Sequence, residues 1–241
     1  MVTAMIFAGG TGTRMHSTTK PKQFLELNGK PIIIHTLEYF EQHEQVDNIV
    51  VVCLEGWVDY LEKLLLRFRI SKVKNIVLGG KTGQESIFQG LLAVEKLYND
   101  VQNHIVMIHD GVRPLISDQL ITDNIECVKK NGNAITVTKC TETVVMLDEK
   151  DEIQNAIDRN ACRLAKAPQS FILGDILDAH RRAKKSGKIN IIDSATLMAL
   201  YGYKLYTVES GSENIKITTP SDFYIFRAIF EARENSQIWG I

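Results

Sequence analysis

Glycine and basic residues gather near the start of the chain, directly after a short apolar segment. The segment Ala8-Gly9-Gly10-Thr11-Gly12-Thr13-Arg14-Met15 is followed by Pro21-Lys22-Gln23-Phe24. Glycines allow the backbone to approach a ligand closely and to present its N–H groups, which suits phosphate. Two separate cations, Arg14 and Lys22, suit a nucleoside triphosphate that loses pyrophosphate, because charge must be neutralised on both the α-phosphate and the leaving group. The loop therefore predicts a nucleotidyl-transfer site.

Two other phosphate loops fit this segment poorly. The dinucleotide pattern G-x-G-x-x-G matches at Gly10 and Gly12, but its third glycine would fall on Met15. A dehydrogenase would also need an acidic residue at the end of a second strand, and Glu26 lies in a loop-like Pro-Lys-Gln-Phe-Leu-Glu segment instead. The pattern G-x-x-x-x-G-K-[ST] is absent. A tight glycine turn with solvated cations is the remaining alternative.

The elements that must position this loop alternate along the chain. We expect strands at 3–7, 48–53, 75–78, 104–109, 134–138 and 205–208, and helices at 32–41, 58–68, 84–97, 117–130, 173–185, 194–201 and 220–234. The first four strands are rich in Val and Ile without clean alternation, which is typical of parallel strands buried on both faces. The pattern predicts a doubly wound, mostly parallel α/β sheet. Ligands of such sheets bind at the carboxyl ends of the strands, where the glycine loop lies.

One region breaks the alternation. Residues 141–147 and 153–157 have the pattern of two strands around the polar turn 148–152. We interpret them as a β-arm, at about 138–160, that projects from a single domain spanning residues 1–241. Because an isolated hairpin is marginally stable, the arm is expected to pack on a partner. A simple surface hairpin is the alternative.

Composition excludes several functional classes. Lys and Arg total 28 against 29 Asp and Glu, a net charge of -1, which argues against nucleic-acid binding. No run approaches the ~18 apolar residues of a membrane span, and the N-terminus lacks the basic region of a signal peptide, so we expect a cytoplasmic protein without membrane contact. The cysteines are Cys53, Cys127, Cys140 and Cys162. None has C-x-x-C spacing, which argues against a zinc or redox site.

The glycine loop also belongs to a wider set of segments. It resembles the signature of the polyol-phosphate cytidylyltransferases, a family that includes 2-C-methyl-D-erythritol 4-phosphate cytidylyltransferase and the ribitol-5-phosphate cytidylyltransferases of wall and capsule synthesis. The resemblance continues through His109-Asp110-Gly111-Val112-Arg113-Pro114, Asp158-Arg159-Asn160, Pro168-Gln169 and Asn214-Ile215-Lys216-Ile217-Thr218. It covers nearly the whole chain. It implies a Rossmann-like, GT-A-like nucleotidyltransferase fold and transfer of CMP from CTP to a phosphorylated polyol.

The resemblance also implies roles for individual residues. As catalytic residues, Arg14, Lys22 and Lys216 would stabilise charge on the triphosphate. The contacts to cytidine and its phosphates would come from Phe7, Ala8, Gly9, Gly10, Gly80, Ser86 and Gly111. Those to the acceptor would come from Asp110, Arg113, Thr143 and Arg159. The threonine on the arm is Thr143, or Thr141 if the alignment shifts.

Two further expectations follow from the same resemblance. In family dimers the arm reaches the partner's site, so we expect a homodimer in which Thr143 and Arg159 are supplied in trans. The triphosphate chemistry implies Mg²⁺, which usually keeps waters and phosphate ligands and few protein ligands. Asp110 is the one candidate for a protein ligand.

The sequence departs from the family at two places. Gly83 stands where the family usually has arginine, and Ala167 stands where it usually has threonine. The neighbouring Lys81 and Lys166 are the cations that could take over a contact. Both changes fall on the base or acceptor side of the site, so they bear on the acceptor more than on cytidylyl transfer.

The acceptor is therefore left open among three classes. Gly56-Trp57-Val58 and Val112 favour ribitol 5-phosphate, which is the preferred reading. The segment Asp158-Arg159-Asn160 favours 2-C-methyl-D-erythritol 4-phosphate of isoprenoid synthesis. Another phosphorylated polyol of surface-glycan synthesis is the third possibility. A nucleotide-binding module without activity is the alternative of a different class.

Overall fold

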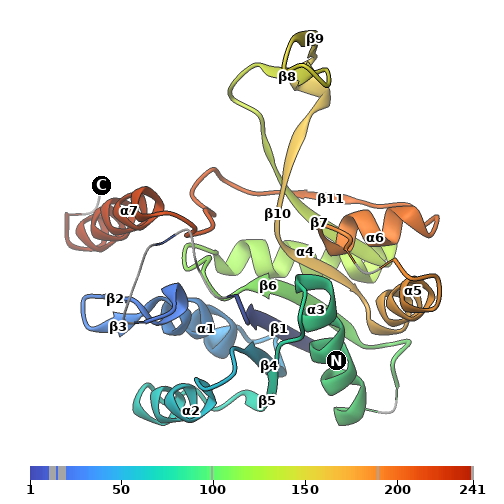
Figure 1. The fold of residues 1–241 in the computed structure, drawn as a ribbon. Helices are drawn as coiled ribbons and strands as arrows, with labels where there is room; N and C mark the ends of the chain where they lie inside the picture. Colours follow the sequence, from blue (N-terminus) through green and yellow to red (C-terminus); the bar gives the residue numbers. More distant parts are fainter. Residues whose placement is uncertain (11–14, 16–19, 99, 189, 240–241) are drawn as a thin grey trace.

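The computed structural model describes residues 1–10, 15, 20–98, 100–188 and 190–239. Within these residues a seven-stranded sheet has the order β11-β7-β10-β6-β1-β4-β5 (Figure 1). Its strands are β1 (Val2–Ala8), β4 (Asn48–Cys53), β5 (Val73–Leu78), β6 (Ile105–Asp110), β7 (Asn133–Lys139), β10 (Arg163–Ile172) and β11 (Thr207–Glu209). Neighbouring strands are parallel except at β10, which is antiparallel to both β6 and β7. The predicted mostly parallel α/β sheet is confirmed.

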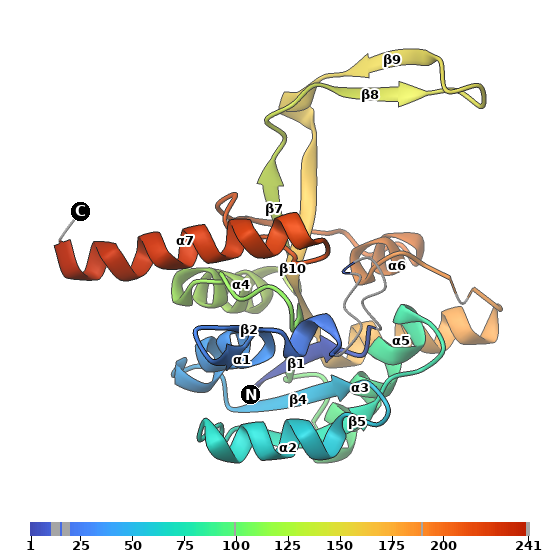
Figure 2. The ribbon, with the colours of Figure 1, turned by 60° about the vertical axis from the view of Figure 1, so that its left-hand side comes forward.

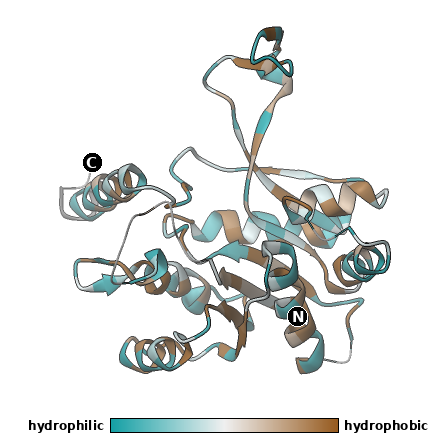
Figure 3. Cartoon of the chain, viewed as in Figure 1, coloured by the Kyte–Doolittle hydropathy of each residue, from teal (hydrophilic) through white to brown (hydrophobic). Residues whose placement is uncertain are grey.

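Helices cover both faces of this sheet. They are α1 (Ile32–Gln42), α2 (Val58–Arg67), α3 (Gly83–Leu97), α4 (Asp118–Asn131), α5 (Leu173–Lys185), α6 (Ser194–Leu200) and α7 (Pro220–Trp239). The apolar sides of α1, α2 and α4 form one core cluster, and those of α3, α5 and α6 form a second. Helix α7 packs through Phe226 on a third, smaller cluster. Figure 3 shows the most hydrophobic ribbon in the central strands, with hydrophilic residues on the outer sides of the helices.

The central strand β1 explains why the sequence shows no alternation. Its Ala4 and Ile6 belong to the first core cluster and Met5 to the second, and all three side chains are fully buried. Successive side chains of a strand point to opposite faces, so a strand covered on both sides is apolar at nearly every position. With both faces covered, a ligand can reach the sheet only at the ends of its strands.

Side-chain caps fix where two of the predicted helices begin. The Thr82 hydroxyl accepts a hydrogen bond from the Glu85 amide at 3.1 Å and opens α3. The Ser117 hydroxyl accepts from the Leu120 amide at 3.3 Å and opens α4, which ends at Gly132 with a φ of 86°. The cap on α3 matters for function, because it holds the helix start against the loop that follows β5.

A small hairpin anchors the segment after the glycine loop. Strands β2 (Glu26–Leu27) and β3 (Lys30–Pro31) are joined by Asn28 and Gly29, whose φ angles of 53° and 74° suit a two-residue turn of this kind. The 3-10 helix η2 (Lys22–Phe24) precedes it. Phe24 is fully buried and stacks on Trp57, with ring centroids 4.9 Å apart. The backbone that carries Lys22 is thereby attached to the core beside α2.

Strand β10 was not predicted from the sequence, although it lies inside the sheet. Charged residues at Arg163 and Lys166 and a proline at Pro168 break the apolar pattern of this segment. Its register against β7 shifts between Ala165 and Gln169, on either side of the proline. Proline has no N–H to give to a ladder, and it is tolerated in a strand where the pairing is irregular. Burial between β6 and β7 therefore overrides an unfavourable local sequence.

The arm extends from the far ends of β7 and β10. Strands β8 (Val144–Leu147) and β9 (Ile153–Ile157) form an antiparallel hairpin that projects away from the sheet in both views (Figures 1 and 2). The Asp148 carboxylate closes its turn by accepting from the amides of Lys150 and Glu152 at 2.8 and 3.0 Å. Large apolar side chains on and below the arm are exposed in the single chain, namely Val145, Met146, Leu147, Ile153 and Leu164.

Candidate active site

A cleft of about 370 Å³ opens at the carboxyl ends of β1 and β6, where a doubly wound sheet binds ligands. Phe7, Asp110, Arg113 and Lys216 line it, so the fold brings together four residues that the sequence analysis placed in the site. The two departures from the family pattern, Gly83 and Ala167, also line this cleft, together with Lys166 and Gln169.

The centre of the cleft is a carboxylate held between two cations. Asp110 ends β6, and its Oδ1 accepts from Lys216 Nζ at 2.8 Å while its Oδ2 accepts from Arg113 Nε at 2.8 Å. The Asp110 side chain is 15% exposed and that of Lys216 is 41% exposed. Burial raises the pKa of the Asp110 carboxyl, but the charges of Lys216 and Arg113 outweigh burial and hold this pKa well below its usual range. Asp110 is therefore ionised, and it orients a lysine whose other side faces the cleft.

Arg113 and Asn214 tie three parts of the chain together behind this pair. Arg113 Nη1 donates to the Asn214 carbonyl at 2.9 Å, and Asn214 Nδ2 donates to the Ala167 carbonyl at 2.7 Å. Lys166 Nζ also donates to the Asn214 carbonyl, at 3.1 Å. Burial, and then the charge of Arg113, lower the pKa of Lys166. These contacts fix the segment before Lys216 against β6 and β10.

The glycine loop is supported from below by a side chain that the sequence analysis quoted without giving it a role. Gln23 is 1% exposed, and its Nε2 donates to the Ala8 carbonyl at 2.7 Å and to the Gly10 carbonyl at 3.3 Å. It thereby sets the path of the backbone as it leaves β1. No sequence signal marks this role, because both contacts depend on how the backbone returns after the loop.

The other residues expected at the nucleotide come from neighbouring strand ends. The Gly111 amide donates to the Phe7 carbonyl at 2.8 Å, so the turns after β1 and β6 lie side by side. After β5, the Gly80 amide donates to Ser86 Oγ at 2.9 Å, and this hydroxyl donates to the Thr82 carbonyl at 2.8 Å. Ser86 is buried and shapes the loop that carries Gly80, with Gly9 packed against the same loop.

Of the two cations of the loop, the structure describes only Lys22. Arg14 lies outside the residues that the structure describes. Lys22 begins η2 and is partly buried. Burial raises the pKa of Asp222, in the first turn of α7, but hydrogen bonds from Thr219 and Thr218 and the charge of the nearby Lys22 lower this pKa overall. Lys22 therefore lies on the side of the site that the segment of Lys216 occupies.

The two arm residues do not join the cleft of their own chain. Thr143 directly precedes β8, and Arg159 begins the 3-10 helix Arg159–Ala161 after β9, the hairpin that projects in Figure 2. Neither residue lines the cleft. Arg159 Nη1 donates to the Thr141 carbonyl at 3.2 Å, across the base of the arm. Within one chain the structure therefore separates the expected acceptor-phosphate residues from Asp110 and Lys216.

His109 borders the cleft but has the surroundings of a packing residue. It is 1% exposed, its Nε2 lies 3.2 Å from the Arg113 carbonyl, and its ring packs 5.2 Å from that of Phe40. Burial lowers its pKa to about 4, so the imidazole is neutral at physiological pH.

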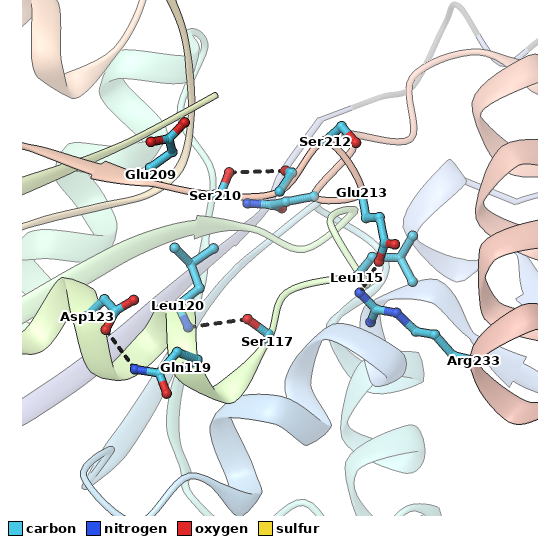
Figure 4. Close-up of a pocket in the computed structure, with 12 residues that line it drawn as sticks. Leu115, Ser117, Gln119, Leu120, Asp123, Glu209, Ser210, Ser212, Glu213 and Arg233 are labelled. Carbon is cyan, nitrogen blue, oxygen red and sulfur yellow. Dashed lines mark hydrogen bonds and ion pairs between the residues drawn. The ribbon is translucent and has the colours of Figure 1, made fainter. Parts of the chain in front are cut away.

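A second cleft of similar size, about 360 Å³, lies between α4, the segment after β11 and α7 (Figure 4). Its carboxylates come from Asp123, Glu209 and Glu213, and its cation, Arg233, already pairs with Glu213 at 2.6 Å. A triphosphate would be repelled there, so the charge pattern favours the first cleft as the nucleotide site.

A protein-built metal centre finds no support in the described part of the chain. Its His, Cys, Asp and Glu residues form no group of three or more that could hold an ion. Both carboxylate oxygens of Asp110 are already engaged by cations.

Comparison with known proteins shows the family of the chain. The family model described as 2-C-methyl-D-erythritol 4-phosphate cytidylyltransferase, IspD, matches residues 2–232. A ribitol-5-phosphate cytidylyltransferase of Vibrio parahaemolyticus is 55% identical over 100% of both chains. One of Streptococcus agalactiae serotype V is 52% identical over 98% of both. The crystal structure of 4-diphosphocytidyl-2C-methyl-D-erythritol synthase from Anaerococcus prevotii superposes with a TM-score of 0.81, at 27% identity over 95% of this chain and 96% of that one. The chain belongs to the IspD family of cytidylyltransferases.

Proposed function

We propose that this protein transfers CMP from CTP to D-ribitol 5-phosphate, giving CDP-ribitol and pyrophosphate. The observation that carries the proposal is the Asp110–Lys216 pair, held beside the glycine loop at the carboxyl edge of the sheet. The choice of acceptor rests on the relatives. Two that are 55% and 52% identical to this chain over nearly their whole length bear the name ribitol-5-phosphate cytidylyltransferase.

The reaction is an in-line displacement at phosphorus. An oxygen of the acceptor phosphate forms a bond to the α-phosphorus of CTP while the bond from that phosphorus to the bridging oxygen of pyrophosphate breaks. Lys216 Nζ, oriented by Asp110, supplies positive charge where the α-phosphate becomes more negative, and Lys22 and Arg14 do so at the leaving group. The attacking phosphate is already anionic, so no general base is required, and the neutral His109 keeps a packing role.

The family resemblance supports an assignment of residues to the nucleotide and to the acceptor. We assign the backbone of Phe7, Ala8, Gly9 and Gly10 to the nucleotide. Gly80, Ser86 and Gly111 complete this set. On the acceptor side, Lys166 is the cation that stands beside Ala167, where the family usually has threonine, and it lines the cleft.

We further propose that the active species is a homodimer. Thr143 and Arg159 are too far along the arm to serve their own cleft, and the apolar residues around β8 and β9 are exposed in a single chain. Insertion of the arm into a second copy would bury these side chains and would deliver Arg159 to the acceptor phosphate of the partner's site.

We propose Mg²⁺ as a companion of CTP. The described residues offer no cage of three protein ligands, so the phosphates and waters would hold the ion. Neutralisation of triphosphate charge is the chemistry that it would supply.

We propose a cytoplasmic location and a role in supplying an activated polyol to surface-glycan synthesis. In the part of the chain that the structure covers, no helix combines the length and the apolarity needed to cross a membrane. CTP is a cytoplasmic substrate, which suits this location.

The test is pyrophosphate release with CTP and Mg²⁺ against a panel of acceptors: ribitol 5-phosphate, 2-C-methyl-D-erythritol 4-phosphate, glycerol phosphates and other phosphorylated polyols. We expect release with ribitol 5-phosphate and its loss in Lys22→Ala, with the circular dichroism spectrum unchanged. Release with 2-C-methyl-D-erythritol 4-phosphate alone would refute ribitol 5-phosphate as the acceptor and assign the protein to isoprenoid synthesis. CTP binding without release on any acceptor would identify an inactive nucleotide-binding module.

A further inference from the structure

Two of the four cysteines lie at the base of the arm, where the proposed mechanism gives them no role. The antiparallel ladder between β7 and β10 ends with Arg163 opposite Lys139. One further step in the same register sets Cys162 opposite Cys140. The two cysteines are too far apart in the sequence to match a C-x-x-C motif, which is why the sequence alone predicts no redox site.

Beyond the cysteines the chain before β10 forms the 3-10 helix Arg159–Ala161, and it still contacts the segment that follows β7. Arg159 Nη1 donates to the Thr141 carbonyl at 3.2 Å, and the β8–β9 ladder then begins with Val144 opposite Ile157. The cysteines are thus bracketed by cross-strand contacts on both sides. We call residues 139–141 and 159–163 the waist of the arm.

Extended by one residue, the register of the β7–β10 ladder predicts a Cα separation at the waist that a disulfide can span. Residues directly opposite in an antiparallel pair point to the same face, with Cα atoms about 4.5–5.5 Å apart. Disulfides join Cα atoms about 4.4–6.8 Å apart. Both cysteines are free thiols and partly exposed, so a small reagent can reach them.

The other two cysteines provide internal controls. Cys53 is fully buried in β4, and burial raises its pKa to about 11, which keeps it protonated and unreactive. The Cys127 thiol lies on α4 and donates to the Asn133 carbonyl at 3.4 Å.

The structure assigns Cys140 and Cys162 to a dithiol site that closes reversibly into a disulfide by exchange with a small disulfide such as oxidised glutathione. One cysteine thiolate attacks a glutathione sulfur and releases one glutathione, and the opposed cysteine then attacks the mixed disulfide and releases the second. Two protein thiols are oxidised, one small disulfide is reduced to two thiols, and the two protons pass to the leaving thiolates. The exposed guanidinium groups of Arg159 and Arg163 favour approach of the glutathione carboxylates.

The link has a consequence that rests on the proposed function. It closes a loop that contains Thr143 and Arg159, and it fixes the distance between the two strands that carry the arm. A rigid waist alters how the arm presents these residues to the acceptor, while the CTP cleft of the same chain is untouched. We expect oxidation to change the acceptor KM at least threefold and the CTP KM by less than twofold.

Peptide mapping tests the site without reference to activity. Trypsin cleaves after Lys139, Lys150, Arg159 and Arg163, which places Cys140 in the peptide 140–150 and Cys162 in the peptide 160–163. After treatment of the intact protein with oxidised glutathione and alkylation of the remaining thiols, we expect these two peptides joined by a disulfide. The link should disappear on treatment with reduced glutathione, and Cys53 should remain alkylatable only after unfolding.

The matched variants are Cys140→Ser and Cys162→Ser. In each, the remaining cysteine should keep one glutathione adduct, because no opposed thiol resolves it, and oxidation should leave the acceptor KM unchanged. Stable adducts on both cysteines of the wild type, or no linked peptide in fully oxidised glutathione, would overturn the site. A linked peptide with an unchanged acceptor KM would support the disulfide and refute its effect on acceptor binding. Peptide mapping does not depend on turnover, so a protein inactive in the acceptor panel would still show the linked peptides.

Discussion

Asp110 has two cationic partners, and we expect removal of Arg113 to affect mainly stability and removal of Lys216 to affect mainly catalysis. Arg113 is a buried partner, with a side chain 11% exposed that also donates to the Asn214 carbonyl, whereas Lys216 is 41% exposed. Breaking a buried ion pair by removing one partner costs about 3–5 kcal/mol, and Asp110 keeps Lys216, so Arg113→Ala should lower the free energy of unfolding by about 3 kcal/mol. An exposed pair is worth at most about 1 kcal/mol, which is the expected cost of Lys216→Ala.

The effects on melting temperature and on catalysis separate the two roles. At about 2–4 °C per kcal/mol for a protein of this size, Arg113→Ala should lower Tm by about 6–12 °C and Lys216→Ala by no more than about 4 °C. Removal of one charge stabiliser from the transition state costs about 10²–10³ in rate, so Lys216→Ala should lose about this factor in kcat. The assays are differential scanning calorimetry and pyrophosphate release. Lys139→Ala, which breaks an exposed pair with Glu209 at 3.2 Å, is the control and should change neither. Equal Tm losses in the two variants, or near-wild-type kcat in Lys216→Ala, would refute this reasoning.

Three further predictions concern the arm, the packing of α3 and pH. Arg159→Ala should raise the acceptor KM at least tenfold and leave the CTP KM within twofold, and the reverse pattern in steady-state kinetics would remove Arg159 from the acceptor site. Gly90→Ala should lower the free energy of unfolding by about 1–3 kcal/mol in urea titrations, because its added Cβ would meet Met5, whereas Gly83→Ala has open space at that position and should stay within about 0.5 kcal/mol. Because the pKa of Asp110 is depressed in the folded state, its stabilising contribution is complete above the unfolded pKa of about 4 and should be lost as pH falls further. Asp110→Asn should flatten that part of the stability profile, and an unchanged slope in acid would contradict the assignment.

The parts of the fold that the sequence predicts best are those in which local pattern and burial agree. β1, β4 and β6 are apolar along most of their length because helices cover both faces, and their sequence pattern already indicates parallel strands. β10 could not be found in this way. Its charged residues and proline suit an exposed segment, and the place between β6 and β7 is decided by pairing partners distant in sequence.

The same distinction applies to the residues of the site. The glycine loop and its cations lie next to one another in sequence, so the sequence alone predicts their chemistry. The contact of Lys216 with Asp110 joins residues 106 positions apart, and only the family resemblance brought both into one site. The hydrogen bonds of Gln23 to the Ala8 and Gly10 carbonyls were not predicted, because they depend on the return of the backbone after the loop.

The position of β10 in the sheet also affects how the protein folds while it is being synthesised. β1, β4, β5 and β6 can assemble as soon as they are synthesised, but the neighbour of β6 is β10, which follows only after β7 and the entire arm. Until then β6 presents an unpaired edge, the kind of surface that recruits other nascent chains. Substitutions that delay closure of the arm should therefore reduce the yield of native protein during synthesis, even where the finished molecule has normal stability and turnover.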